Sequence, residues 1–87
     1  MELKEQFEAA VAKSKTLKER PGNDVLLKLY SLYKQATDGD APENGDYGMF
    51  DFVGKAKHDA WLKYAGIQKE DAMQEYVSFV SQLTDTI

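Results

Sequence analysis

The segment from Val25 to Ala36 carries more apolar surface than one side of a helix can bury. A helix turns by about 100° per residue, which puts two sets of these side chains on nearly opposite sides. The first set is Val25, Leu29, Leu32 and Ala36, and the second is Leu27, Tyr30 and Lys34. We therefore predict a helix over about residues 23–37 with one side in a core and a second side that is a candidate ligand surface.

The polar residues of this helix indicate what kind of ligand the second side could bind. The purely polar strip is narrow and consists of Lys28, Ser31 and Gln35. Half-exposed tyrosines are common, so the second side can also be an ordinary amphipathic surface without a ligand. Tyr30 and Lys34, however, lie one turn apart and point a phenol and an ammonium the same way from an apolar strip. This pattern fits an amphipathic anion, either a fatty chain that ends in phosphates or an acidic amphipathic peptide helix.

The segment before this helix also has helical spacing. Apolar side chains recur at intervals typical of one helix face, which predicts a helix over about residues 3–15. The residues of that face are Leu3, Phe7, Ala10, Val11 and Ser14. Pro21 and Gly22 interrupt the helical pattern, and Asn23 is expected to cap the following helix.

The second half of the chain contains a loop and two further helices. Residues 38–48 hold three glycines, a proline and four acids, which predicts a long loop. Asp51 is expected to cap a third helix through about Tyr64, and Gly66 is expected to end it. A fourth helix follows, with Glu70 and Asp71 in its first turn and an apolar stripe of Ala72, Tyr76, Phe79 and Leu83.

A chain of 87 residues without cysteine depends on a hydrophobic core for its stability. This length leaves room for one domain, residues 1–87. Hydrophobic residues make up 43% and charged residues 30%, which is typical of globular proteins and not of disordered chains. The predicted fold class is all-α, a single four-helix bundle with a long loop between its second and third helices.

Charge and residue content argue against several functional classes. The 11 Lys and Arg against 15 Asp and Glu give a net charge of −4, the wrong sign for a protein that binds nucleic acid. No apolar run approaches the roughly 18 residues of a membrane span, and the N-terminus lacks the layout of a signal peptide. We therefore expect a cytoplasmic protein with no nucleic acid partner and no integral membrane association.

Catalytic and metal chemistry also lack support. His58 is the only histidine, and neither a cysteine nor a Gly-x-Ser-x-Gly turn supplies a nucleophile. We expect His58 to be exposed on the third helix and the protein not to be an enzyme. The spacing of a calcium loop is present at Asp40, Asn44, Gly45 and Asp51. Pro42 fills one of its ligand positions and Asp replaces the usual last Glu, so we expect no metal site and no cofactor.

Three blocks of the sequence form a recognisable series: Leu29–Thr37 followed by Gly39 and Asp40, then Gly48–Trp61, and then Lys69–Met73 with Tyr76. In this order and with these separations they resemble the acyl-CoA-binding protein family. The resemblance implies a cytosolic carrier that binds long-chain fatty acyl-CoA one to one, buffers and delivers it, and catalyses nothing. We expect a monomer whose further partners are acyl-CoA-using enzymes. The alternative hypothesis is a helical-bundle interaction module that binds an amphipathic peptide helix.

The resemblance also implies roles for individual residues. Those implied to hold the ribose 3′-phosphate are Tyr30, Lys34 and Lys57. Other headgroup positions are Lys15, Tyr33 and Tyr76, and the acyl chain is implied to lie along Phe7, Ala10, Val11, Leu26 and Leu27. Charge-assisted bonds suit a dianionic phosphate, and a buried acyl chain contributes about 0.8 kcal/mol per CH₂.

Positions on the third helix complete the prediction. Lys55 and Lys57 are about 200° apart on a helix, so only one can face the groove, and the resemblance favours Lys57. Trp61 is expected to pack in the core rather than to stack on a ligand. Val53 stands where the family usually has lysine, one turn before Lys57, so this chain lacks one cation there.

Overall fold

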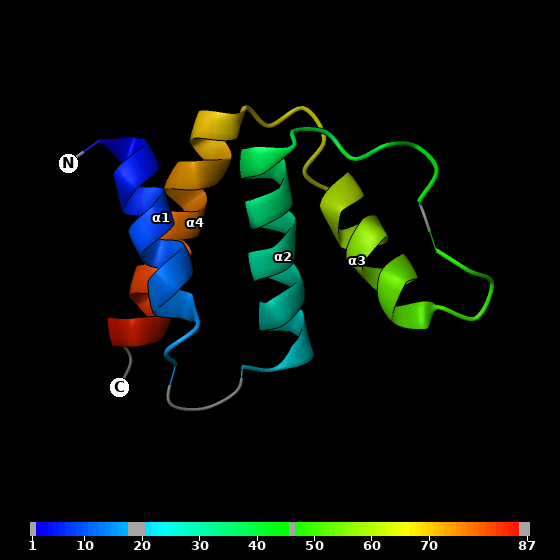
Figure 1. Cartoon of the computed structure of the whole chain (residues 1–87), viewed down its shortest axis with the longest axis horizontal. Coiled ribbons are helices and arrows are strands. Elements are labelled where there is room, and N and C mark those ends of the chain that lie inside the picture. Colours follow the sequence, from blue (N-terminus) through cyan, green and yellow to red (C-terminus); the bar gives the residue numbers. More distant parts are fainter. Residues whose placement is uncertain (1, 18–20, 46, 86–87) are drawn as a thin grey trace.

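The structure is a computed structural model that describes residues 2–17, 21–45 and 47–85. Within these ranges the chain forms four helices and no strand, which confirms the predicted all-α class. The helices are α1 (Leu3–Ser14), α2 (Asn23–Thr37), α3 (Phe52–Leu62) and α4 (Lys69–Asp85). Figure 1 shows α2 and α3 running in one direction and α1 and α4 in the other.

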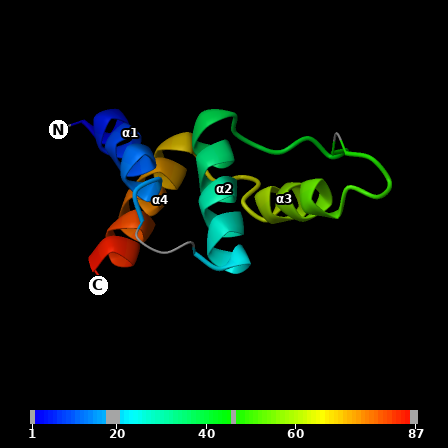
Figure 2. The ribbon, with the colours of Figure 1, turned by 60° about the horizontal axis from the view of Figure 1, so that its bottom comes forward.

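The central helix is α2, which packs against α4 on one side and against α3 on the other. Helix α1 packs against α4. Two views show α1 and α4 on one side of α2 and α3 on the other, in a molecule of 39 × 28 × 16 Å (Figures 1 and 2). In the described part of the chain α3 therefore has α2 as its only helical neighbour. The second side of α2, treated as a candidate ligand surface, is partly covered by α3.

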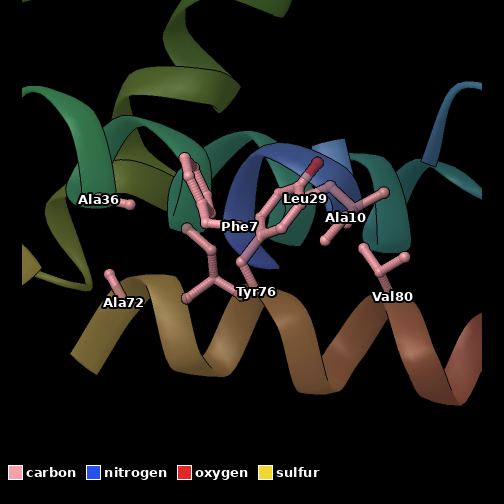
Figure 3. Close-up of a cluster of buried hydrophobic side chains, with 8 residues drawn as sticks. Phe7, Ala10, Leu29, Ala36, Ala72, Tyr76 and Val80 are labelled. Carbon is pink, nitrogen blue, oxygen red and sulfur yellow. The ribbon is translucent and has the colours of Figure 1, made fainter. Parts of the chain in front are cut away.

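The hydrophobic core belongs to three of the four helices. One buried cluster joins Phe7 and Ala10 of α1, Leu29, Leu32 and Ala36 of α2, and Ala72, Tyr76 and Val80 of α4. Figure 3 shows these side chains meeting between the three helices. Each buried Leu, Phe or Val contributes about 1.5–3 kcal/mol through the removal of apolar surface from water. Since α3 adds nothing to this cluster, other contacts have to hold it in place.

Two of the three residues of the polar strip of α2 lie inside the molecule, and the third, Lys28, is exposed. Ser31 and Gln35 are completely buried. The Ser31 hydroxyl donates to the Leu27 carbonyl at 2.7 Å, and the Gln35 amide donates to the Asp40 carboxylate at 2.9 Å and to the Ile67 carbonyl at 2.7 Å. Burial of these groups is tolerated because their donors have partners. The Gln35 bonds also tie the loops on either side of α3 to α2.

The N-terminal caps of two helices test the sequence predictions. Asp51 caps α3 as predicted, with its carboxylate accepting from the Gly54 backbone N–H at 2.9 Å. The prediction for Asn23 is wrong, because Asn23 is already the first residue of α2 and Gly22 occupies the cap position without a side-chain bond. Helix α2 therefore begins without a side-chain cap.

Helix α3 ends earlier than predicted. It stops at Leu62, and the following turn uses shorter-range backbone bonds such as Tyr64 N–H to the Trp61 carbonyl at 2.9 Å. Gly66 then adopts φ +90°, a left-handed conformation that glycine accepts without strain. Gly66 thus ends the turn before α4, four residues after α3 itself has ended.

The described residues between α2 and α3, 38–45 and 47–51, contact α3. The Trp61 indole N–H donates to the Gly39 carbonyl at 2.8 Å, and Trp61 is buried as predicted. His58 is not exposed, contrary to the prediction. It is 7% exposed, its Nε2 lies 2.6 Å from the Pro42 carbonyl, and the Tyr47 ring lies 5.8 Å away. The loop therefore buries a residue that would be exposed on α3 alone.

Candidate ligand site

A groove lies between the N-terminal halves of α2 and α3, which draw apart toward these ends (Figure 1). Its volume of about 580 Å³ falls within the range of about 300–1,000 Å³ for small-molecule sites. We call it the α2–α3 groove, and its lining residues are Asn23, Leu26, Leu27 and Tyr30 from α2 and Phe52, Val53, Ala56 and Lys57 from α3. The lining is mostly apolar and includes one cation.

That cation lies against an aromatic ring. The Lys57 ammonium is 5.3 Å from the centroid of the Tyr30 ring, within the range of a cation–π interaction. Lys57 is exposed, so its ammonium remains available to an anion. Lys55 does not line the groove, which agrees with the choice of Lys57.

A second groove lies where α1, α2 and α4 meet. This α1–α2–α4 groove has a volume of about 560 Å³ and is lined by Lys4, Phe7, Glu8, Val11, Tyr33, Ala36, Thr37, Lys69 and Met73. The Tyr33 ring stacks on Phe7, with ring centroids 5.9 Å apart and 22° between the planes. Tyr33 is 40% exposed, so its ring remains accessible at the rim to a flat partner.

Lys34 lines neither groove but lies close to Tyr30 of the first groove and Tyr33 of the second. Its ammonium forms an ion pair with Asp38 at 2.5 Å and lies 5.1 Å from the centroid of the Trp61 ring. The hydrogen bond to Asp38 raises the pKa of Lys34 above its ordinary value, and the nearby phenols of Tyr30 and Tyr33 act in the same direction. The charge of Lys34 is therefore close to the tyrosine of each groove.

Comparison with known proteins identifies the family. The family model "Acyl CoA binding protein" matches residues 4–80. The chain belongs to this family. An acyl-CoA-binding protein homolog from Manduca sexta is 47% identical over 83 residues, which are 95% of this chain and 92% of the relative. The crystal structure of Oryza sativa acyl-CoA-binding protein 2 matches with a TM-score of 0.88 and 41% identity, covering 98% of this chain and 93% of that one.

The same domain also occurs within a larger protein. Enoyl-CoA delta isomerase 2 from Rattus norvegicus is 49% identical over 82 residues. The match covers 94% of this chain and 21% of the isomerase. The similarity is thus confined to the part of the isomerase that corresponds to the acyl-CoA-binding domain.

The residues that the family resemblance singled out fall into five groups. Leu26, Leu27, Tyr30 and Lys57 line the α2–α3 groove. Phe7, Val11 and Tyr33 line the α1–α2–α4 groove, and Lys34 lines neither groove but lies close to Tyr30 and Tyr33. Ala10 and Tyr76 are in the core, and Lys15 is exposed directly after α1 and lines neither groove. The ligand roles of all these residues remain predictions.

Tyr76 shows how the core position differs from a surface position. It is 3% exposed, its hydroxyl lies 3.2 Å from that of Ser14, and its ring meets Phe7 edge-on at 5.1 Å. Burial raises the pKa of the Tyr76 phenol above its ordinary value. Tyr33, Phe7 and Tyr76 thus form a run of rings from the surface into the core. Phe7 packs on both tyrosine rings and supports the exposed Tyr33 ring from the core side.

The resemblance did not single out the α3 wall of the groove as a binding surface. Phe52, Val53, Ala56 and Lys57 line that wall, and only Lys57 was assigned to the ligand. Phe52 and Val53 are 72% and 67% exposed, and Met49 and Phe50 just before them are 87% and 80% exposed. The one-turn spacing from Phe52 and Val53 to Ala56 and Lys57 was available in the sequence as a signal of a shared face.

The described residues were also compared with the requirements for a metal site and for a membrane span. Among the described residues, no group of three or more His, Asp and Glu could hold a metal ion. Asp40 and Asp51, two of the residues at calcium-loop spacing, accept bonds from Gly66 N–H and Gly54 N–H instead. In the same part of the chain, none of the helices has the length and apolar character that crossing a membrane requires.

Proposed function

We propose that this chain binds long-chain fatty acyl-CoA thioesters one to one and carries them without catalysis. In this proposal residues 1–87 act as a single monomeric domain in the cytoplasm, and acyl-CoA-using enzymes receive the ligand. The family membership supports the ligand class. The observation that carries the proposal is the apolar α2–α3 groove with the Lys57–Tyr30 pair at its edge.

The two halves of the ligand match two kinds of surface. A phosphate dianion is stabilised by charge-assisted bonds, which Lys34 and Lys57 can supply together with the Tyr30 hydroxyl. Adenine presents a flat face, for which the accessible ring of Tyr33 is a suitable partner. An acyl chain gains about 0.8 kcal/mol for each CH₂ that it buries against apolar side chains such as Leu26 and Leu27. Because both halves contribute, either half alone should bind weakly.

Titration calorimetry tests this proposal directly. The purified chain is titrated with palmitoyl-CoA, with free CoA and with palmitate under identical conditions. We expect one site for palmitoyl-CoA and at least about tenfold weaker binding, or 1.4 kcal/mol, for each of the other two compounds. Equal affinity for palmitate and palmitoyl-CoA would refute the headgroup assignment.

The second candidate function is binding of an amphipathic peptide helix. It is favoured by the exposed apolar side chains Met49, Phe50, Phe52 and Val53 next to the groove, because helix-in-groove recognition uses apolar anchors of this kind. A peptide does not require the Lys34 and Lys57 ammonium groups to converge on a phosphate. Binding of model amphipathic helices together with no heat from palmitoyl-CoA would favour this alternative.

A further inference from the structure

The ion pair between Lys34 and Asp38 occupies one of the cations that the ligand is proposed to use. The two residues are four apart, and their ammonium and carboxylate groups lie 2.5 Å from one another at the end of α2. A carboxylate on the same ammonium repels an approaching phosphate and competes with it for the hydrogen-bond donors. In this structure the charge of Lys34 is therefore already offset by Asp38.

The ion pair between Lys34 and Asp38 should contribute little to the free energy of folding. The Asp38 side chain is 51% exposed and that of Lys34 is 27% exposed, and exposed ion pairs contribute little to folding. Asp38 is the C-cap residue of α2, where the helix dipole disfavours a negative charge. The Lys34 ammonium also has the Trp61 ring as a second partner, 5.1 Å from its centroid. Loss of the Asp38 charge should therefore leave the fold intact.

We propose that Asp38 is an affinity-setting residue that competes with the ligand's phosphate for Lys34. This inference rests on the proposed function. When a phosphate binds, Lys34 has to release Asp38 or share its charge between two anions, and either event weakens the hold on the headgroup. Binding of the acyl tail is unaffected, so Asp38 makes the affinity depend less on the CoA headgroup and more on the tail. The protein then binds free CoA more weakly than it would without Asp38, which favours release of CoA after the acyl group has been removed.

The decisive variant is Asp38→Asn, which removes the charge and keeps the size of the side chain. We expect it to bind both palmitoyl-CoA and free CoA about three- to fivefold more tightly than the wild-type chain. Palmitate, which has no phosphate, should show no gain. The gain should shrink as salt is raised, because the interaction is between charges near the surface. Calorimetry at two ionic strengths measures all of these quantities.

Two controls separate competition from general effects. Glu43→Gln removes one negative charge from an exposed position of the same loop, and it should leave affinity unchanged. In a Lys34→Ala chain, adding Asp38→Asn should also produce no gain, because the shared ammonium is gone. Equal gains from Asp38→Asn and Glu43→Gln would overturn the inference, since overall charge would then be the cause.

The remaining outcomes distinguish this inference from the proposed function. If wild-type protein binds palmitoyl-CoA and Asp38→Asn binds it equally or less tightly, Asp38 does not compete, and the inference fails alone. Weaker binding would mean that Asp38 holds Lys34 in position for the ligand. If wild-type protein fails to bind palmitoyl-CoA, the proposed function itself fails. Thermal denaturation of each variant verifies that the fold is retained.

Discussion

The two sides of α2 differ in what covers them. Toward α1 and α4, Leu32 is completely buried in the main core. Toward α3, the opposing wall begins with Phe52 and Val53, which are more than two-thirds exposed beside an open groove. The side toward α1 and α4 is closed by the core except at the groove beside Tyr33, whereas the side toward α3 leaves apolar surface available along an open groove.

Because the two sides of α2 are covered differently, substitutions on each side should affect different properties of the protein. The α1–α2–α4 side contains the buried cluster, so substitutions there should act on folding. Helix α3 is attached through α2 and through polar bonds such as those of Trp61 with Gly39 and of Gln35 with Ile67. Substitutions on the exposed wall of α3 should therefore act on ligand binding with little effect on folding.

The largest contrast is expected between Leu32→Ala and Phe52→Ala. Leu32→Ala should destabilise the fold by about 2–5 kcal/mol, because it leaves a cavity in the main core. Phe52→Ala should change folding stability by no more than about 0.5 kcal/mol and should weaken palmitoyl-CoA binding. Urea denaturation and calorimetry measure the two effects. Similar losses of stability would show that the α3 wall is part of the folding core.

A smaller effect is expected when the proposed phosphate cations are removed. Lys34→Ala and Lys57→Ala should each weaken palmitoyl-CoA binding by about 1.5–3 kcal/mol, as for the loss of a charge-assisted bond, without unfolding the domain. Lys55→Ala is the matched control, since Lys55 is also an exposed lysine of α3 and does not line the groove. Equal weakening by all three substitutions would indicate general charge attraction instead of a specific site.

Adding a cation to the α3 wall should produce a modest gain. Val53 lines the groove one turn before Lys57, so Val53→Lys should tighten palmitoyl-CoA binding by about 0.5–1 kcal/mol at low salt. The gain should fall as ionic strength shortens the Debye length below about 10 Å. Val53→Gln supplies a long neutral side chain as the control. A gain that persists at high salt, or that Gln reproduces, would point to packing as its cause.

The smallest effect concerns pH and the attachment of α3. The Gly66 N–H and the Gln35 amide lower the pKa of Asp40 below its ordinary value. A lowered folded pKa means that the contribution to stability is complete above the unfolded pKa and is lost as pH falls below about 4. Protection factors for amide hydrogen exchange in α3, which are corrected for the intrinsic pH dependence of exchange, should therefore fall at acid pH more in the wild type than in Asp40→Asn. Parallel pH profiles for both chains would contradict this role of Asp40.

Part of the candidate site could be predicted from the sequence because its signals are local. Tyr30, Leu26 and Leu27 share one helix, so their common face follows from helical geometry. Family resemblance added Lys57, which the structure places next to Tyr30 although the two are 27 positions apart. The α3 wall was missed as a surface because its partner across the groove comes from another helix.

The sequence by itself determined the four helices, the cap at Asp51 and the two-sided character of α2. These features depend on spacing and capping within a few residues, which the chain order specifies directly. Only the tertiary structure decided which side of each helix is covered. Contacts with Pro42 and Tyr47 help to bury His58, and the Asp40 and Ile67 partners make burial of Gln35 tolerable. The three-helix core includes Tyr76. Such outcomes depend on contacts between distant segments, and local periodicity carries no information about them.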